Sequence, residues 1–278
     1  MRPEAGQLET RHGRSLFTRS WRADLLRARV VLVHGYAEHS GRYGHVAARL
    51  AEAGFDVDAV DLRGHGLSPG RRAVVWRLDG ILDDLGRLVD RVGQREPALP
   101  TFMLGHSMGG LIAALFAAHR LRELAGLVVS GPALRIGAGV HPLLIRFSSL
   151  LGTVLPTLPT IELDDTALSR DREVVEAYRA DPFVYHGRMP ARTGAELLRA
   201  ARQLAGEMEA LALPLLILHG GQDRLAEPAG SRELFTRASS ADKTLRIYEG
   251  LYHEIFNEPC WERVLCDVVR WLTARATR

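Results

Sequence analysis

The sequence predicts an α/β fold in which a mostly parallel central sheet is flanked by helices. Two observations lead to this prediction. Short runs of β-branched and other apolar residues, typical of parallel strands buried on both faces, alternate with longer segments of helical periodicity. This alternation stops near the middle of the chain and resumes later, which indicates a segment inserted between strands of a single sheet.

The composition is that of an ordinary globular protein with enough apolar material for one large core. Of 278 residues, 46% are hydrophobic and 25% are charged. The 36 basic residues are interspersed with 33 acidic ones and the formal net charge is only +3, so we expect no nucleic-acid partner. No segment reaches the roughly 20 apolar residues that span a bilayer, and the first residues lack the apolar run of a secretory signal. We therefore expect a cytoplasmic protein whose membrane contact, if it has one, is peripheral.

The first part of the chain predicts a hairpin followed by alternating strands and helices. Residues 8–21 are expected to form two short strands joined by a turn at 11–14. Apolar β-branched runs then predict buried strands, and periods of three to four residues predict the intervening helices. The strands are expected at 29–33, 55–60, 100–105 and 124–129, and the helices at 45–54, 75–95 and 107–119.

The alternation stops after residue 131, and five prolines divide the segment that follows into short pieces. We interpret residues 132–208 as a helical cap, or lid, inserted between two parts of an α/β core, 1–131 and 209–278. Helices are predicted in the cap at 142–155, 171–180 and 193–211. The core is expected to resume with strands at 213–219 and 244–248 and to end with a helix at 257–276.

The first cap helix is apolar almost all round, and Arg146, Ser149 and Thr153 form its only polar stripe. A helix packed on one face does not need so much apolar surface. Two explanations are open: burial between cap and core, or an apolar gate that admits a lipid and makes transient contact with a membrane or micelle. Under the second explanation, the residues that contact the substrate are Leu143, Phe147, Leu150 and Leu151.

A serine stands at the corner between a predicted strand and a predicted helix. In the segment 105–109, Gly-His-Ser-Met-Gly, the two glycines leave room for a strained turn that exposes the Ser107 hydroxyl. The helix that follows favours negative charge at its first amides, so Met108 N–H is expected to stabilise a developing oxyanion. The strand order places a second oxyanion amide in the loop 34–43, and Tyr36 N–H is our candidate. A turn without a catalytic role is the alternative for that loop.

Serine becomes an effective nucleophile only when a base, held in one tautomer by a carboxylate, takes its proton. Asp223 and His253 each follow a predicted late strand, in the chain order Ser…Asp…His. Because the carboxyl ends of parallel strands meet at one edge of a sheet, we expect the three side chains to converge. Glu227 and Glu249 are weaker alternatives for the acid. The chain has no His, Cys and carboxylate cluster at metal spacing, so neither a metal nor another cofactor is expected.

Longer motifs surround these residues at 34–43, 105–110, 223–225 and 242–253, with two more in the cap at 168–170 and 181–182. With these motifs the chain resembles, from residue 30 to about 257, the monoacylglycerol lipases and related lysophospholipases, serine hydrolases of the α/β-hydrolase fold. The resemblance implies an enzyme that cleaves the ester of a monoacylglycerol to a fatty acid and glycerol through an acyl-enzyme. It further implies that Arg42, Tyr178 and Glu38 bind the polar end of this small lipid ester. Tyr36 departs from the small residue expected after His-Gly, and its phenol is expected to narrow the site.

Two other readings of the sequence stay open. A lysophospholipase or general carboxylesterase would use the same three catalytic residues on a different ester. A non-catalytic binding protein that retains the fold belongs to another functional class, because a fold alone does not establish a function. The complete set of Ser107, Asp223 and His253 favours an enzyme.

Overall fold

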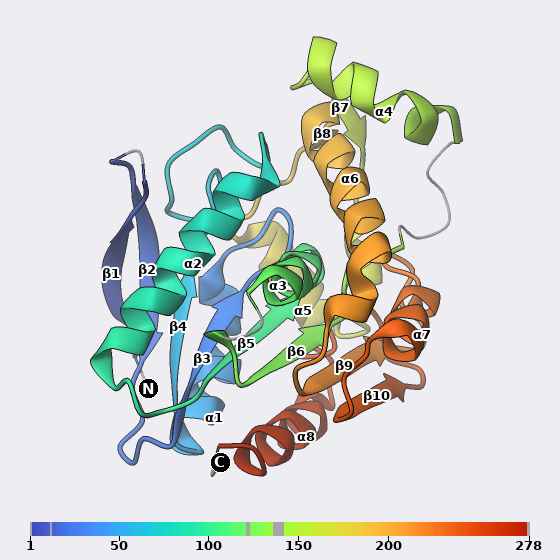
Figure 1. Ribbon diagram of the computed structural model, residues 1–278. Helices are drawn as coiled ribbons and strands as arrows, with labels where there is room; N and C mark the ends of the chain where they lie inside the picture. Colours follow the sequence, from blue (N-terminus) through green and yellow to red (C-terminus); the bar gives the residue numbers. More distant parts are fainter. Residues whose placement is uncertain (1, 12, 121–122, 136–141, 277–278) are drawn as a thin grey trace.

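The computed structural model describes the whole chain except residues 1, 12, 121–122, 136–141 and 277–278. Its centre is an eight-stranded sheet with the strand order β1-β2-β4-β3-β5-β6-β9-β10 (Figure 1). In the described part of this sheet, β2 pairs antiparallel with β1 and with β4 and the other five pairings are parallel, which confirms the mostly parallel sheet predicted from the sequence. The strands are β1 (Glu4–Glu9), β2 (Ser15–Trp21), β3 (Ala28–Val33), β4 (Phe55–Val60), β5 (Thr101–His106), β6 (Gly126–Ser130), β9 (Leu215–Gly220) and β10 (Lys243–Tyr248).

The sheet is buried on both faces because alternate residues of a strand enter different cores. In β3, Val31 and Val33 pack into one core and Val30 and Leu32 into the other. The helices that contribute to the first core are α2 (Leu78–Arg95), α3 (Met108–His119), α6 (Ala191–Glu207) and α7 (Pro228–Arg237). The helices that contribute to the second core are α1 (Gly44–Glu52) and α8 (Trp261–Thr273), on the opposite face of the sheet (Figure 1).

The sequence predicted the type of each element more accurately than the residues at which it begins and ends. The predicted hairpin is formed by β1 and β2, although its expected turn includes residue 12, which lies outside the described residues. The helix expected at 75–95 begins only at Leu78, because Val75 instead donates its amide to the Thr193 hydroxyl at 2.9 Å. The helix expected at 257–276 is shorter at both ends, since the chain at Asn257 still turns back onto Glu254.

The segment between β6 and β9 lies at the carboxyl ends of the strands, although β6 and β9 themselves pair directly. It contains α4 (Pro142–Val154), α5 (Arg172–Ala180) and α6, together with a small sheet, β7 (Pro159–Ile161) and β8 (Met189–Pro190), that the sequence did not predict. Figure 1 shows α6 running from α4 down to α3, so this helix links the outermost part of the segment to the core. Among the described residues, no helix is both long and apolar enough to cross a bilayer.

Candidate active site

Ser107 occupies the junction of β5 and α3 in a strained backbone conformation, with φ 54° and ψ −118°. The glycines two residues before and after it make this turn feasible. A Cβ at Gly105 would clash with the backbone of Gly109, and a Cβ at Gly109 would clash with the carbonyl of Val33. The turn is fixed further by the Ser107 amide, which donates to the Ser130 carbonyl at 2.9 Å. The strain therefore holds the serine hydroxyl at the end of the sheet.

Ser107, His253 and Asp223 form one hydrogen-bonded chain. The distance from His253 Nε2 to Ser107 Oγ is 2.8 Å, and the distance from His253 Nδ1 to Asp223 Oδ2 is 2.7 Å. The other carboxylate oxygen of Asp223 accepts the amides of Leu225 and Ala226 at 2.8 and 2.9 Å. Loops after three different strands thus bring together a serine, a histidine and an aspartate that lie up to 146 residues apart in sequence, in the arrangement that serine nucleophile, base and acid require.

Burial and charge act in opposite directions on these two ionisable groups. Burial lowers the pKa of His253, but the adjacent negative charge and hydrogen bond of Asp223 outweigh it and raise that pKa above its ordinary value. Burial raises the pKa of Asp223, yet the neighbouring His253 and His219 hold it well below the usual range of a carboxyl. Asp223 therefore stays ionised near neutral pH and stabilises an imidazolium at His253.

The loop after β3 passes directly in front of the serine. A Cβ built on Gly35 would lie 3.3 Å from Ser107 Cβ, so the backbone of this loop reaches the nucleophile. The Gly35 amide is already engaged, since it donates to Glu38 Oε1 at 2.6 Å. Within the described residues, the Tyr36 and Met108 amides have no hydrogen-bond partner, although both residues line the cavity above Ser107. Two free backbone donors beside the nucleophile are what a developing oxyanion requires.

Arg42 stands at the centre of a buried ionic cluster. Its guanidinium donates to both oxygens of Glu254 at 2.6 and 2.7 Å and to Glu38 Oε2 at 2.8 Å, and it lies 4.8 Å from the ring centroid of Tyr178. Burial raises the pKa of Glu254, but Arg42 brings it down to about 2. Glu38, Glu254 and Tyr178 line the cavity, whereas Arg42 does not. The structure thus places Arg42 behind the polar end of the cavity, where it holds the two carboxylates and does not itself line the cavity.

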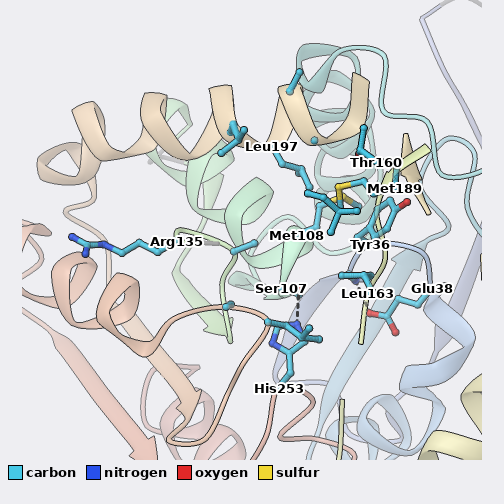
Figure 2. A pocket seen from close by; sticks show the side chains of 18 of the residues that line it. Tyr36, Glu38, Ser107, Met108, Arg135, Thr160, Leu163, Met189, Leu197 and His253 are labelled. Atoms are coloured by element: carbon cyan, nitrogen blue, oxygen red, sulfur yellow. Dashed lines mark hydrogen bonds between the residues drawn. The ribbon is translucent and has the colours of Figure 1, made fainter. Parts of the chain in front are cut away.

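The cavity above Ser107 is polar at one end and apolar over most of its wall. Figure 2 shows Ser107 and His253, joined by a dashed line, with Glu38 to one side and Met189, Thr160 and Leu197 above them in this view. Tyr36 is also part of the lining. The apolar wall is contributed chiefly by the segment between β6 and β9, through Ile145, Leu151, Ile161, Leu163, Met189, Leu197 and Leu198. Such a cavity fits a molecule with a long apolar part and a small polar part.

The α4 residues selected from the sequence point in two directions. Leu151 lines the cavity. Leu143, Phe147 and Leu150 are not among its lining residues, and their exposed fractions are 57%, 47% and 60%. These three side chains therefore face outward, and only Leu151 is placed to contact a molecule bound above Ser107.

Two residues of the site were missed in the sequence. Glu254 follows His253 directly, but its partner Arg42 is 212 residues away, so no local pattern links them. His219 lies four residues before Asp223, and its contacts with the acid depend on how the loop after β9 folds back. The packing of a third histidine, His106, against His253 at a ring separation of 4.8 Å is likewise set by the sheet and not by local sequence.

Comparison with known proteins is consistent across sequence and structure. The family model described as serine aminopeptidase, S33, matches residues 25–260. A monoacylglycerol lipase of Mycolicibacterium smegmatis is 46% identical over 245 residues, covering 88% of each chain, and the monoglyceride lipase of Homo sapiens is 36% identical over 95% of this chain and 88% of its own. The crystal structure of Paleococcus ferrophilus monoacylglycerol lipase matches with a TM-score of 0.87 at 33% identity, covering 94% of this chain and 99% of that one.

Proposed function

This chain belongs to the monoacylglycerol lipase family of α/β-hydrolases, and from that premise we propose that it is a serine hydrolase that cleaves monoacylglycerols to a free fatty acid and glycerol. The observation that carries the proposal is the hydrogen-bonded chain of Ser107, His253 and Asp223 at the floor of a largely apolar cavity. A single ester with one long apolar arm and a small hydroxylated arm matches both ends of that cavity.

The geometry supports hydrolysis through an acyl-enzyme. Ser107 Oγ attacks the ester carbonyl carbon while His253 Nε2 takes its proton, and the amides of Tyr36 and Met108 stabilise the oxyanion. When the tetrahedral intermediate collapses, the imidazolium returns that proton to the glycerol oxygen and the acyl group remains on Ser107. Water then attacks the acyl-enzyme while His253 takes its proton, and the imidazolium returns that proton to Ser107 Oγ as the ester bond breaks and the fatty acid leaves. Asp223 stays ionised throughout and holds the imidazole in one tautomer.

The two ends of the cavity suit the two products. The carboxylates of Glu38 and Glu254 and the phenol of Tyr178 accept hydrogen bonds from glycerol hydroxyls, while Arg42 holds both carboxylates in position. The apolar wall, Leu151 included, takes the acyl chain, and each buried methylene contributes about 0.8 kcal/mol. Long-chain esters therefore bind better than short ones.

The outward face of α4 supports transient contact with a membrane or micelle. Leu143, Phe147, Leu150 and Val154 are all about half exposed or more, so they form an apolar surface on the outermost helix of residues 132–208. We assign that segment the role of a cap, which covers the catalytic residues and rests on the lipid surface from which substrate is drawn. The contact is peripheral, because 13 residues are too few to span a bilayer.

A substrate panel tests the proposed function. Glycerol and fatty acid release from a long-chain monoacylglycerol is compared with turnover of a lysophospholipid and of a short p-nitrophenyl ester, with the Ser107→Ala protein alongside. We expect the monoacylglycerol to have the highest kcat/KM and the variant to be inactive on all three. A preference for the lysophospholipid would reassign the substrate. No labelling of purified protein by a serine-directed fluorophosphonate would indicate a binding protein that only retains the fold.

A further inference from the structure

His219 contacts the catalytic acid from inside the core. It is the penultimate residue of β9, its side chain is fully buried, and its Nε2 lies 3.1 Å from Asp223 Oδ2 and 3.0 Å from the carbonyl oxygen of Ala226. Its Nδ1 lies 2.7 Å from the hydroxyl of Ser231 in α7. The ring thus joins a core strand, the loop that carries the acid and the helix that follows.

These contacts identify the tautomer of His219. The two neighbours of Nε2, the Asp223 carboxylate and the Ala226 carbonyl, only accept hydrogen bonds, so Nε2 must carry a proton. The Ser231 hydroxyl is able to donate to Nδ1, and a neutral ring is then satisfied on both nitrogens. A second proton would add a positive charge in a fully buried site where the single charge of Asp223 is already needed by His253.

Both oxygens of Asp223 have neighbours on two sides. Oδ1 accepts the amides of Leu225 and Ala226, and Oδ2 accepts from His253 on one side and faces His219 Nε2 at 3.1 Å on the other. The carboxylate is therefore unable to rotate without losing a hydrogen bond at each oxygen. Because both imidazole rings approach Asp223 Oδ2, the contact with His219 also affects how strongly this oxygen attracts the proton on His253 Nδ1.

Resting on the catalytic assignment made above, we propose that neutral His219 is a positioning residue for the reaction: its Nε2–H, which is hydrogen-bonded to the Ala226 carbonyl, is shared with Asp223 Oδ2 at 3.1 Å and fixes the carboxylate that orients His253. The role goes beyond holding the loop together. A donor at Oδ2 offsets part of the carboxylate charge, so its removal makes Asp223 a stronger acceptor for His253 and makes His253 more basic. Loss of His219 therefore shifts the protonation of His253 to higher pH, which loss of packing alone does not do.

The pH readout is interpretable because the groups around His253 are known. Asp223 faces it from the loop after β9, Glu254 from its own loop and Glu38 from the loop after β3, and Arg42 pairs with both glutamates. His106 faces it from β5, and burial lowers the pKa of His106 to about 4. Because the pKa values of Asp223, Glu254 and His106 are all lowered and that of His253 is raised, His253 changes charge at a higher pH than these three neighbours.

Three variants test the role. In His219→Phe the donor is lost, and we expect the acid limb of the kcat/KM profile on a soluble ester to move up by about half a pH unit and kcat to fall roughly tenfold. His219→Gln keeps an amide N–H near the position of Nε2 and should recover most of both effects. Ser231→Ala removes the contact at Nδ1 but leaves the donor to Asp223, so its profile should match the wild type.

The outcomes separate this role from the catalytic assignment. If the wild type is not labelled by a fluorophosphonate, the proposed function fails; if it is labelled and His219→Phe keeps the wild-type midpoint and kcat, only the role of His219 fails. Should His219→Phe not fold, the 15N spectrum of imidazole-labelled wild type decides. Protonated Nε2 and unprotonated Nδ1 at His219 support the proposal, and the opposite tautomer overturns it.

Discussion

The catalytic edge of the sheet and helix α4 lie on opposite sides of one cavity and are held in place by different forces. At the edge, Asp223, His253, Glu38 and Glu254 are buried, and their hydrogen bonds with one another, with Ser107 and with Arg42 fix the geometry. Helix α4 instead packs its inner side against α6 and exposes most of its large apolar residues. Hydrogen bonds are directional and apolar contacts are not. Hydrogen bonds therefore hold the side chains whose chemistry requires fixed distances. Apolar contacts form the wall that must fit flexible acyl chains.

Residues 168–170, in the segment between β6 and β9, are hydrogen-bonded to the catalytic edge of the sheet and, among the described residues, not to α4. Leu168 accepts the amide of Glu254 at 2.8 Å, Ser169 donates to the Asn257 carbonyl at 2.8 Å, and Arg170 pairs with the buried Glu258. Within α4, Ser148 and Thr153 donate to carbonyls of their own helix. A change in the outward face of α4 should therefore leave the catalytic hydrogen bonds intact.

Removing a member of the catalytic chain should give the largest effect. Ser107→Ala, Asp223→Asn and His253→Ala are each expected to lower kcat by about 10⁴-fold or more, and double variants should lose little further, because the three residues act as a unit. Steady-state hydrolysis of a monoacylglycerol measures the loss, and circular dichroism checks folding. Retention of most activity by Asp223→Asn would move the acid to Glu227 or Glu249.

The second prediction concerns the stability of the catalytic edge. Arg42→Ala leaves Glu254 and Glu38 buried without their cation, so we expect the free energy of unfolding to fall by about 3–5 kcal/mol. The matched control is Arg49→Ala, since Arg49 pairs with Glu52 on the surface and its loss should change stability by about 0.5 kcal/mol at most. Urea denaturation measures both. Equal, small losses of unfolding free energy in both variants would mean that the buried cluster of Arg42, Glu38 and Glu254 does not stabilise the catalytic edge.

Sequence patterns predicted the catalytic edge better than the far wall. Ser107, Asp223 and His253 each follow a recognisable strand, and parallel strands bring such positions to one edge. The sequence predicted that α4 is a helix with apolar residues almost all round. It did not predict that Leu150 faces solvent and the adjacent Leu151 faces the cavity, because the direction of each side chain depends on how α4 packs on α6. The position of Arg42 behind the cavity depends on its ion pair with Glu254, and these two residues meet only in the folded chain.

The third prediction follows from the raised pKa of His253. His253 must be neutral to accept the serine proton, so kcat/KM should rise with pH, by about tenfold per unit below that pKa, and level off above it. Because Asp223 holds the pKa above its ordinary value, the midpoint should lie above 6.5. A stopped-assay profile on a soluble ester measures it. A profile flat from pH 5 to 9 would argue against a histidine base.

The smallest effects are expected on α4, and they separate its two faces. Leu151→Ser removes part of the cavity wall, so turnover of long-chain esters should fall several-fold while short soluble esters are spared. Leu150→Ser changes the outward face, so vesicle binding should weaken while turnover of monomeric substrate is unchanged. Sedimentation with liposomes and a chain-length series measure the two. Equal losses on both substrate classes, with a lowered melting temperature, would show that both leucines serve packing alone.

The central claim is that Ser107 carries the acyl group during hydrolysis of a monoacylglycerol, and trapping of that intermediate tests it most directly. The enzyme is mixed with a monoacylglycerol, and the reaction is quenched in acid within the first turnovers. The protein is then digested, and the mass of the peptide that contains Ser107 is measured by mass spectrometry. We predict a mass increase equal to one acyl group on Ser107 in the wild type, and neither adduct nor glycerol release in Ser107→Ala. An acyl group on another residue, or glycerol release by Ser107→Ala at the wild-type rate, would contradict the account.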